Sequence, residues 1–226
     1  MSSMVVDKVP FGCGALDDLL EGGVEPGSVT LIYGEAGTGK TNLCLVLARN
    51  IARQGKKVVY LDTEGLSLER YRQICGDDYE CVLKSTLVFE AHSFEDQEKM
   101  VDKAIKLAEG NIDVGMIVVD SVSMYYRITS REDRGERKSL ASQSTKLLAI
   151  ARKRIIPVLL TTQVYTDVER GSFEPLGGHS LMHNAKTLLK LEKVSMGRRR
   201  AVLMKHRHIE EGRSAEFRLV REGIEC

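Results

Sequence analysis

Residues 34–41 read Gly-Glu-Ala-Gly-Thr-Gly-Lys-Thr, which satisfies the G-x-x-x-x-G-K-[ST] pattern of a phosphate-binding loop. The apolar run Val-Thr-Leu-Ile-Tyr at residues 29–33 precedes this stretch, and a helix-like run over residues 42–53 follows it. This context matters because glycines let the backbone turn its N–H groups toward a phosphate at a helix N-terminus, where the partial charge is positive. A Gly-rich turn that matched the pattern by chance would lack this strand before it and helix after it. Residues 34–41 therefore predict a nucleotide-binding α/β fold.

The loop also predicts which groups hold the nucleotide. Lys40 is expected to reach the β- and γ-phosphates of ATP, and the Thr41 hydroxyl to bind Mg²⁺. ATP and Mg²⁺ are thus the expected cofactors. The expected nucleotide-binding residues are Gly34, Glu35, Ala36, Gly37, Thr38, Gly39, Lys40, Thr41 and Asn42.

Strand-like and helix-like runs alternate along most of the chain. The strands are expected at residues 29–33, 57–62, 86–90, 115–120 and 156–162, and the helices at residues 41–53, 68–75, 94–109 and 137–152. Nearly continuous Val, Ile and Leu runs separated by helices predict a mostly parallel sheet covered on both faces. After residue 162 a polar, Gly-rich stretch leads to three further strand-like runs, at residues 187–194, 200–205 and 215–220, with a hairpin turn at residues 195–198. We expect these last strands to be antiparallel and to extend the edge of the sheet.

The overall composition limits the classes of partner. The 226 residues include 33 Lys plus Arg and 32 Asp plus Glu, a net charge of +1, so any nucleic-acid-binding surface must be a local basic patch. No apolar run approaches the roughly 18 residues that cross a bilayer, and residues 1–10 lack the apolar core of a signal peptide. A cytoplasmic protein is therefore expected.

The cysteines are scattered and include no C-x-x-C pair. Their odd number and irregular spacing argue against a zinc site or a disulfide framework. Reduced thiols are the favoured interpretation, and a disulfide of the kind found in hyperthermophiles is the alternative. The five cysteines are Cys13, Cys44, Cys75, Cys81 and Cys226.

Three polar residues are predicted to follow the ends of buried strands. Asp120 ends the run Met-Ile-Val-Val-Asp at residues 116–120, where its carboxylate can hold Mg²⁺ beside Thr41. Glu64 follows the second strand and can accept the proton of an attacking water. Gln163 ends the fifth strand and can sense the γ-phosphate and shift the loop that follows. The alternatives are an ordinary strand end for Asp120, a solvated loop residue for Glu64 and a turn hydrogen bond for Gln163. Together with Lys40, Glu64 and Gln163 form the predicted catalytic set.

These elements, in this order, resemble the RecA/RadA recombinase family. The resemblance covers almost the whole chain, through residues 11–23, 34–41, 62–65, 118–121 and 161–164. It implies a RecA-like P-loop NTPase core: a mostly parallel sheet flanked by helices, with antiparallel strands at the C-terminal end. Neither an N-terminal helix-hairpin-helix domain nor a clear aromatic-x-x-Ala polymerisation segment is visible, and the short archaeal paralogues of the family share these absences. We therefore expect one RecA-like ATPase core domain over residues 1–226.

The resemblance implies further roles for basic residues. Arg70 lies near the family arginine that stacks on adenine. Lys205 and Arg207 lie where RecA-like filaments present basic residues to the γ-phosphate bound by a neighbouring subunit. In other NTPases a cation supplied in this way raises the rate of hydrolysis by roughly 10³–10⁵. The alternative is that Lys205 and Arg207 are charges at a sheet edge, where they prevent aggregation.

Two basic segments are candidates for contact with DNA. Arg127, Arg131 and Arg134 lie in the region that corresponds to the first DNA-binding loop of RecA-like folds, but acidic residues are interleaved with them, as in a solvated mixed-charge loop. The second region, residues 165–180, carries little basic charge. Three consecutive arginines, Arg198, Arg199 and Arg200, occupy the predicted hairpin turn and form a local phosphate-binding patch, unless they only solubilise the turn.

The resemblance implies an ATP-binding and DNA-binding protein of homologous recombination and DNA repair. We expect an accessory or mediator with weak ATPase activity and little or no strand exchange. Its expected partners are single-stranded or branched DNA and a RadA-type recombinase or other repair proteins, with no membrane. A monomer or dimer is expected in place of a long filament. A protein-binding switch controlled by nucleotide, with negligible turnover, is the alternative, and a small-molecule kinase is a weaker one.

Overall fold

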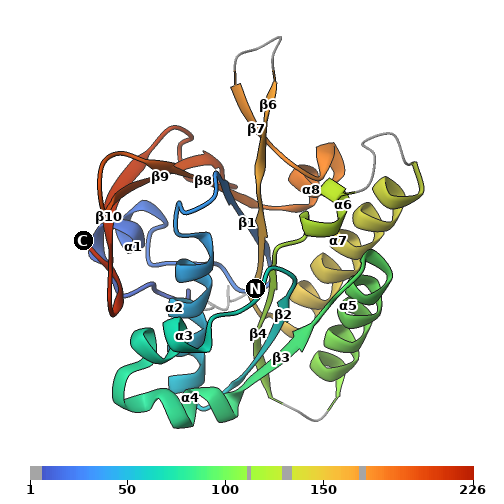
Figure 1. Ribbon diagram of the computed structural model, residues 1–226, viewed down its shortest axis with the longest axis horizontal. Coiled ribbons are helices and arrows are strands. Elements are labelled where there is room, and N and C mark those ends of the chain that lie inside the picture. The colour runs from blue at the N-terminus through green and yellow to red at the C-terminus, as the bar shows by residue number, and fades with distance from the viewer. Residues whose placement is uncertain (1–6, 111–112, 129–133, 168–171) are drawn as a thin grey trace, which may run out of the picture.

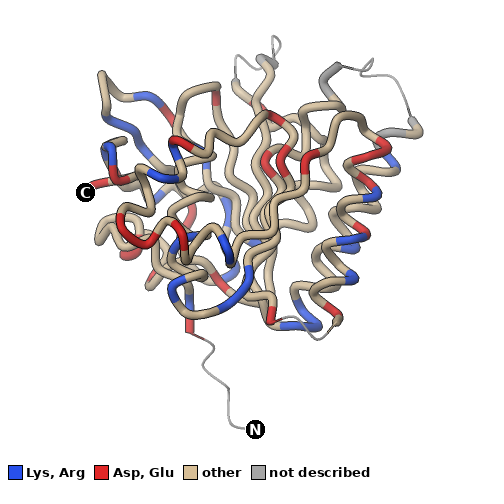
Figure 2. The backbone as a smooth tube through the Cα atoms, turned by 60° about the horizontal axis from the view of Figure 1, so that its bottom comes forward, with Lys and Arg blue, Asp and Glu red and all other residues tan. Residues whose placement is uncertain are grey.

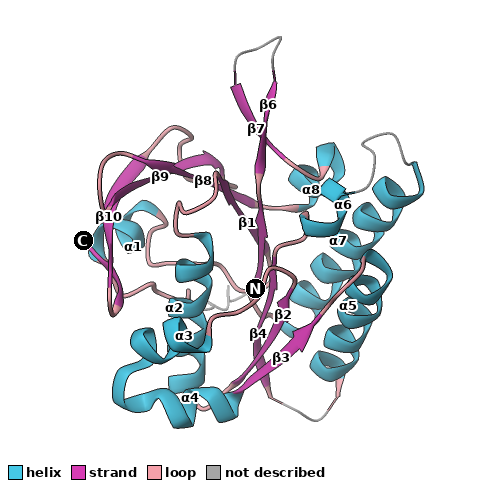
Figure 3. Ribbon diagram, viewed as in Figure 1, coloured by secondary structure: helices cyan, strands magenta, loops and turns pink. Residues whose placement is uncertain are grey.

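The computed structural model describes residues 7–110, 113–128, 134–167 and 172–226. Most of its strands form one sheet, which Figure 3 shows in magenta at the centre of the molecule. The order of its strands is β11 (Gly223–Glu225), β10 (Ser214–Val220), β9 (Arg198–Lys205), β8 (Thr187–Lys193), β1 (Val29–Gly34), β5 (Val158–Thr162), β4 (Val114–Asp120), β2 (Lys57–Asp62) and β3 (Thr86–Glu90). Two more strands, β6 (Val164–Asp167) and β7 (Ser172–Pro175), form a separate hairpin that stands beyond the end of the sheet (Figure 1).

The sheet is mostly parallel, as predicted. From β3 to β8 each neighbouring pair of strands is parallel, and β9, β10 and β11 are antiparallel to their neighbours. The predicted hairpin of β8 and β9 is antiparallel, and β8 also pairs in parallel with β1, so the change of strand direction falls between β8 and β9. A helix, α8 (Gly178–Asn184), precedes β8. A strand that follows a helical crossover returns in the direction of the strand it joins, whereas a hairpin reverses it.

Helices cover both faces of the sheet (Figure 1). On one face lie α1 (Gly14–Leu19), α2 (Lys40–Arg53), α3 (Leu68–Cys75), the short 3-10 helix η1 (Gly76–Asp78) and α4 (Tyr79–Ser85), and on the other lie α5 (Phe94–Glu109), α6 (Met124–Ile128), α7 (Arg134–Arg154) and α8. Successive residues of a strand point to opposite faces. Accordingly Ile32 and Tyr60 pack in the core beneath α2, whereas Leu31 and Leu61 pack in the core beneath α5 and α7. Two apolar cores explain why the strands read as continuous hydrophobic runs.

A disulfide joins a residue near the N-terminal end of the described chain to its last residue. Cys13, the N-cap of α1, is bonded to Cys226, with 5.4 Å between the Cα atoms. The expectation of reduced thiols is therefore wrong for this pair, which lies 213 residues apart and gives no spacing signal in the sequence. Cys44 and Cys75 are free and buried, and Cys81 is free and exposed. None of the described helices has the length and apolar character needed to cross a bilayer.

Candidate nucleotide and DNA sites

The phosphate-binding loop connects β1 to α2, as the sequence predicts. Gly34 ends β1 and Gly39 precedes α2, and their φ angles are +154° and +102°. A Cβ atom at Gly34 would lie 2.3 Å from the carbonyl oxygen of Leu191 in β8. Glycine is therefore required at Gly34 both for its φ angle and for the close approach of β8. The Thr38 hydroxyl donates to the carbonyl of Glu35 at 2.8 Å and closes the turn.

Lys40 lies on the inner side of this loop. Its ammonium donates to the carbonyls of Gly34 at 2.8 Å and Glu35 at 3.0 Å, and only 8% of the residue is exposed. Burial lowers the pKa of Lys40, and the carboxylates of Glu64 and Asp120 oppose that shift. Backbone carbonyls thus hold the positive charge within reach of a phosphate bound by the loop.

Asp120 ends β4 beside the start of α2. Burial raises its pKa, while hydrogen bonds from Thr161, Tyr60 and Thr41 oppose the rise. The Tyr60 hydroxyl donates to Oδ2 at 2.7 Å, and the Thr161 hydroxyl donates to Oδ1. The structure therefore brings Thr41 and Asp120 together. A hydroxyl and a carboxylate in contact are the oxygen donors that suit Mg²⁺, which keeps most of its waters and binds few protein groups.

Glu64 and Gln163, predicted as separate catalytic residues, are in direct contact. Glu64 Oε1 accepts a hydrogen bond from the Gln163 amide at 3.0 Å and another from the Ser121 hydroxyl at 2.8 Å. Glu64 is exposed, so its carboxylate is open to water. The loop after β2, the end of β4 and the end of β5 thus meet at one side chain.

Two residues that the sequence analysis did not single out hold this arrangement. The Asp62 carboxylate, which is buried, accepts backbone N–H bonds from Glu64 at 3.1 Å, Gly65 at 2.9 Å and Leu66. The Thr63 hydroxyl bonds both the N–H and the carbonyl of Ser121. An Asp followed by a Gly three residues later is typical of a turn closed by the Asp side chain. The sequence could therefore have indicated the role of Asp62, whereas no pattern in the sequence marks Thr63.

Arg70, predicted to stack on adenine, lies in α3 next to the phosphate loop. Its guanidinium donates to the Asn42 side chain at 2.8 Å and to the carbonyls of Val220 at 2.7 Å and Arg221 at 2.9 Å. It therefore connects the start of α2 to the turn between β10 and β11. Stacking on adenine stays a prediction for this residue.

Lys205 and Arg207, predicted to act on a neighbouring subunit, differ in exposure. The Lys205 ammonium donates to the carbonyls of Met182 at 2.9 Å and Ala185 at 2.8 Å, at the C-terminal end of α8, where cations interact favourably with the helix. Arg207 is exposed. A role for either residue across a subunit interface stays a prediction.

Two of the predicted DNA-binding residues of the first basic segment lie in described helices. Arg131 lies outside the described residues, Arg127 lies in α6, and Arg134 is the first residue of α7. Figure 2 shows acidic and basic residues mixed along α5.

The three arginines at the β8–β9 turn also have different environments. Arg199 Nε donates to the carbonyl of Gly37 in the phosphate loop at 3.1 Å, Arg200 pairs with Glu216 at 2.8 Å, and Arg198 is exposed. Lys193 also approaches this loop, because a Cβ atom at Gly37 would lie 3.6 Å from Lys193 Nζ. Two cations, from the end of β8 and the start of β9, thus lie beside the phosphate loop. Arg199 and Gly37 are 162 residues apart in sequence.

Comparison with known proteins gives consistent matches over nearly the whole chain. The sequence profile of the Rad51 family matches residues 3–226. The "DNA repair and recombination protein RadB" of Methanococcoides burtonii is 44% identical over 97% of this chain and 98% of its own length. The protein of the same name from Archaeoglobus fulgidus is 45% identical over 96% of this chain and 97% of its own length. A crystal structure of the RadB recombinase superposes with a TM-score of 0.84 at 36% identity, covering 96% of this chain and 98% of that one.

Proposed function

The chain belongs to the Rad51 family and, within it, to the RadB group of DNA repair and recombination proteins, and from this premise we propose that it binds ATP–Mg²⁺ and DNA as an accessory to a RadA-type recombinase. It hydrolyses ATP slowly and performs little or no strand exchange. The contact between Glu64 and Gln163 is the observation that carries the ATPase part of this proposal.

Each residue of the nucleotide site has a separate task. Lys40 binds the β- and γ-phosphates from the inner side of the loop, and the loop N–H groups hold the phosphates in place. Thr41 and Asp120 hold Mg²⁺, which neutralises phosphate charge when it is bound. Glu64 accepts the proton of the water that attacks the γ-phosphate, because its carboxylate is exposed to solvent and fixed by two donors.

Gln163 gives the site a way to report the γ-phosphate. Its side chain binds Glu64, and its carbonyl accepts the N–H of Leu176 at 2.8 Å. Leu176 follows β7, so a change at Gln163 reaches both ends of the β6–β7 hairpin. That hairpin lies within the region expected to bind DNA, and this supports coupling between nucleotide and DNA.

The ATPase test compares the chain with Glu64→Gln and Lys40→Ala, with and without single-stranded DNA. We expect DNA-stimulated turnover that falls by about 10²–10⁴ in Glu64→Gln, the usual contribution of a general base, with ATP affinity retained. Lys40→Ala should lose ATP affinity. Turnover that is equal in Glu64→Gln and the unchanged chain would remove Glu64 from the catalytic role.

A nucleotide-controlled switch that binds a protein partner is the second candidate function. The connection from Glu64 through Gln163 to the β6–β7 hairpin favours it equally well, because a switch needs the same link without turnover. Tight ATP binding with negligible hydrolysis, together with partner binding that depends on ATP, would select the switch over the ATPase.

The accessory role is tested with the cognate recombinase. We expect the chain to speed loading of a RadA-type recombinase on single strands coated with binding protein, and an unchanged loading rate would exclude mediation. We also propose a monomer or dimer in solution. Light scattering in the presence of ATP and DNA should then show no extended filaments.

A further inference from the structure

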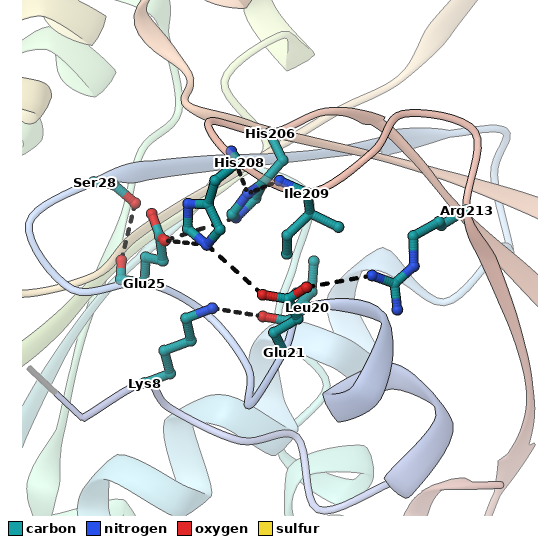
Figure 4. A network of polar contacts seen from close by, with 9 residues as sticks. All are labelled: Lys8, Leu20, Glu21, Glu25, Ser28, His206, His208, Ile209 and Arg213. Carbon is teal, nitrogen blue, oxygen red and sulfur yellow. Dashed lines mark hydrogen bonds and ion pairs between the residues drawn. The ribbon is translucent and has the colours of Figure 1, made fainter. Parts of the chain in front are cut away.

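Two histidines and one glutamate from distant parts of the chain converge outside the nucleotide site. Glu25 lies between α1 and β1, and His206 and His208 lie in the loop between β9 and β10. One ligand atom from each lies within 4.8 Å of the other two, and Figure 4 shows both rings turned toward the Glu25 carboxylate.

The three groups approach one another without forming hydrogen bonds among their ligand atoms. The Nε2 atoms of His206 and His208 each lie 3.8 Å from Glu25 Oε1. These separations exceed the length of a hydrogen bond. Two ligands bound to one Zn²⁺ at about 2.0–2.2 Å in a tetrahedral site lie roughly 3.3–3.5 Å apart. Each distance between Glu25 and a histidine therefore needs to contract by only a few tenths of an ångström, and the ligand atoms of the two histidines, which lie within 4.8 Å of each other, must also approach.

From this geometry we propose that Glu25, His206 and His208 form a binding site for a divalent transition-metal ion, with Zn²⁺ as the ion that the donor set suits best. Two imidazoles and a carboxylate are a recurring set of protein ligands for Zn²⁺, whereas Mg²⁺ and Ca²⁺ prefer sites made only of oxygen.

A second carboxylate lies beside the site, although it is outside the cluster of three. Glu21 Oε2 lies 3.9 Å from His208 Nε2, and Arg213 engages the other oxygen, Oε1, at 3.4 Å. The nearby Lys8 ammonium is held by the carbonyl of Leu20 at 2.8 Å. Two carboxylates therefore offset the charge of an ion, and the two neighbouring cations have their own partners.

His206 is the ligand that must adjust. Its side chain is 1% exposed, and burial lowers its pKa, which favours the neutral imidazole that metals bind. Its Nδ1 accepts long contacts from the N–H groups of His208 at 3.4 Å and Ile209 at 3.3 Å. Binding through Nε2 places the ring proton on Nδ1, so these two contacts open when the ion binds. His208, which carries no such constraint in the described structure, is expected to be the stronger ligand.

The ion would fix the loop that carries Arg207, a residue predicted to act across a subunit interface. Arg207 lies between the two histidines, and Lys205 binds the end of α8. Binding of the ion joins this loop to the segment before β1 and so fixes the direction of Arg207. This consequence does not require ATP, DNA or turnover, so a failure of the proposed ATPase leaves the site testable.

The experiment measures Zn²⁺ binding to the full nucleotide-free chain by calorimetry and elemental analysis, with its disulfide intact. We expect one Zn²⁺ per chain and at least a tenfold loss of affinity in His208→Ala and Glu25→Gln. His92→Ala is the matched control, since His92 is exposed and far in sequence from the cluster, and it should bind as the unchanged chain does. Cys81→Ser removes the exposed thiol and should also leave binding unchanged.

A second measurement on the unchanged chain avoids any variant that fails to fold. Side-chain nitrogen resonances of His206 and His208 should shift on addition of Zn²⁺, while that of His92 stays in place. No bound Zn²⁺, or binding that survives His208→Ala and depends on Cys81, would overturn the proposal. Shifts confined to histidines outside the cluster would overturn it as well.

Discussion

The Gln163 side chain donates a hydrogen bond of 3.0 Å to Glu64 across 99 residues of sequence, so the proposed γ-phosphate sensor and the proposed base share one contact. In Gln163→Ala, Glu64 loses this donor and keeps the bond from Ser121. We expect ATP affinity to be unchanged and turnover to fall by about fivefold, the scale of one lost hydrogen bond near 1 kcal/mol. We also expect ATP to slow protease cleavage of the β6–β7 hairpin in the unchanged chain, and to have no such effect in Gln163→Ala.

Ser121→Ala is the matched control for this prediction. It removes the other donor to Glu64, at 2.8 Å, but leaves the bond from the Gln163 side chain to Glu64. Its turnover should fall similarly while the hairpin still responds to ATP. A hairpin that responds to ATP in Gln163→Ala would show that the signal travels by another route.

Replacing Gly34 and Gly212 should distinguish the cost of a positive φ angle from the cost of a Cβ atom that clashes with a neighbouring strand. Both have positive φ, +154° and +87°, but a Cβ at Gly34 would lie 2.3 Å from the Leu191 carbonyl and a Cβ at Gly212 would meet nothing within 4 Å. Gly34→Ala should lower the free energy of unfolding by about 2–4 kcal/mol, because β8 must move. Gly212→Ala should lower it by about 1 kcal/mol. Urea unfolding measures both, and equal losses would contradict the close approach of β8.

The edge of the sheet that carries the candidate nucleotide site could be predicted from the sequence because the residues that mark it are close in sequence. Buried strands end at Gly34, Asp62 and Asp120, and the carboxyl ends of parallel strands meet at one edge of a sheet. By that rule the residue order alone predicts that Glu64 lies near Asp120. The helix before β8 was not predicted, because α8 has only 7 residues, too few to show a helical period.

Contacts between segments far apart in the chain could not be predicted, because no sequence pattern marks them. Arg70 binds the carbonyl of Val220, 150 residues away, and Arg199 binds that of Gly37, 162 residues away. Backbone carbonyls accept such bonds whatever their side chains are, so neither spacing nor residue type marks the pair. The same is true of the Cys13–Cys226 disulfide.

Arg70 distinguishes a structural role from adenine stacking. Because its guanidinium binds the β10–β11 turn, Arg70→Ala should lower the melting temperature without nucleotide, by about 2–4 °C per kcal/mol for a chain of this size. Arg70→Lys keeps the charge but lacks the several N–H donors of the guanidinium, so it should restore little of the lost melting temperature. If Arg70 acts only on adenine, both variants should melt as the unchanged chain does and differ only in ATP affinity.

Arg198 and Arg199 are adjacent in sequence but should affect different ligands. Arg198 is exposed, whereas Arg199 donates to the carbonyl of Gly37 in the phosphate loop. Arg198→Ala should weaken DNA binding and reduce the slope of log affinity against log salt by about 1, as expected for one lost phosphate contact. Arg199→Ala should instead weaken ATP binding, because the loop loses a contact from β9.

Filter-binding titrations over a range of salt and calorimetry with ATP measure the two effects. Arg200→Ala serves as a control for general loss of charge, since Arg200 is paired with Glu216 and an exposed pair contributes little. If all three variants changed the salt slope equally, the arginines would act as one DNA-binding patch and the contact with Gly37 would have no separate function. If none changed it, DNA binding would have to be assigned to another surface of the chain.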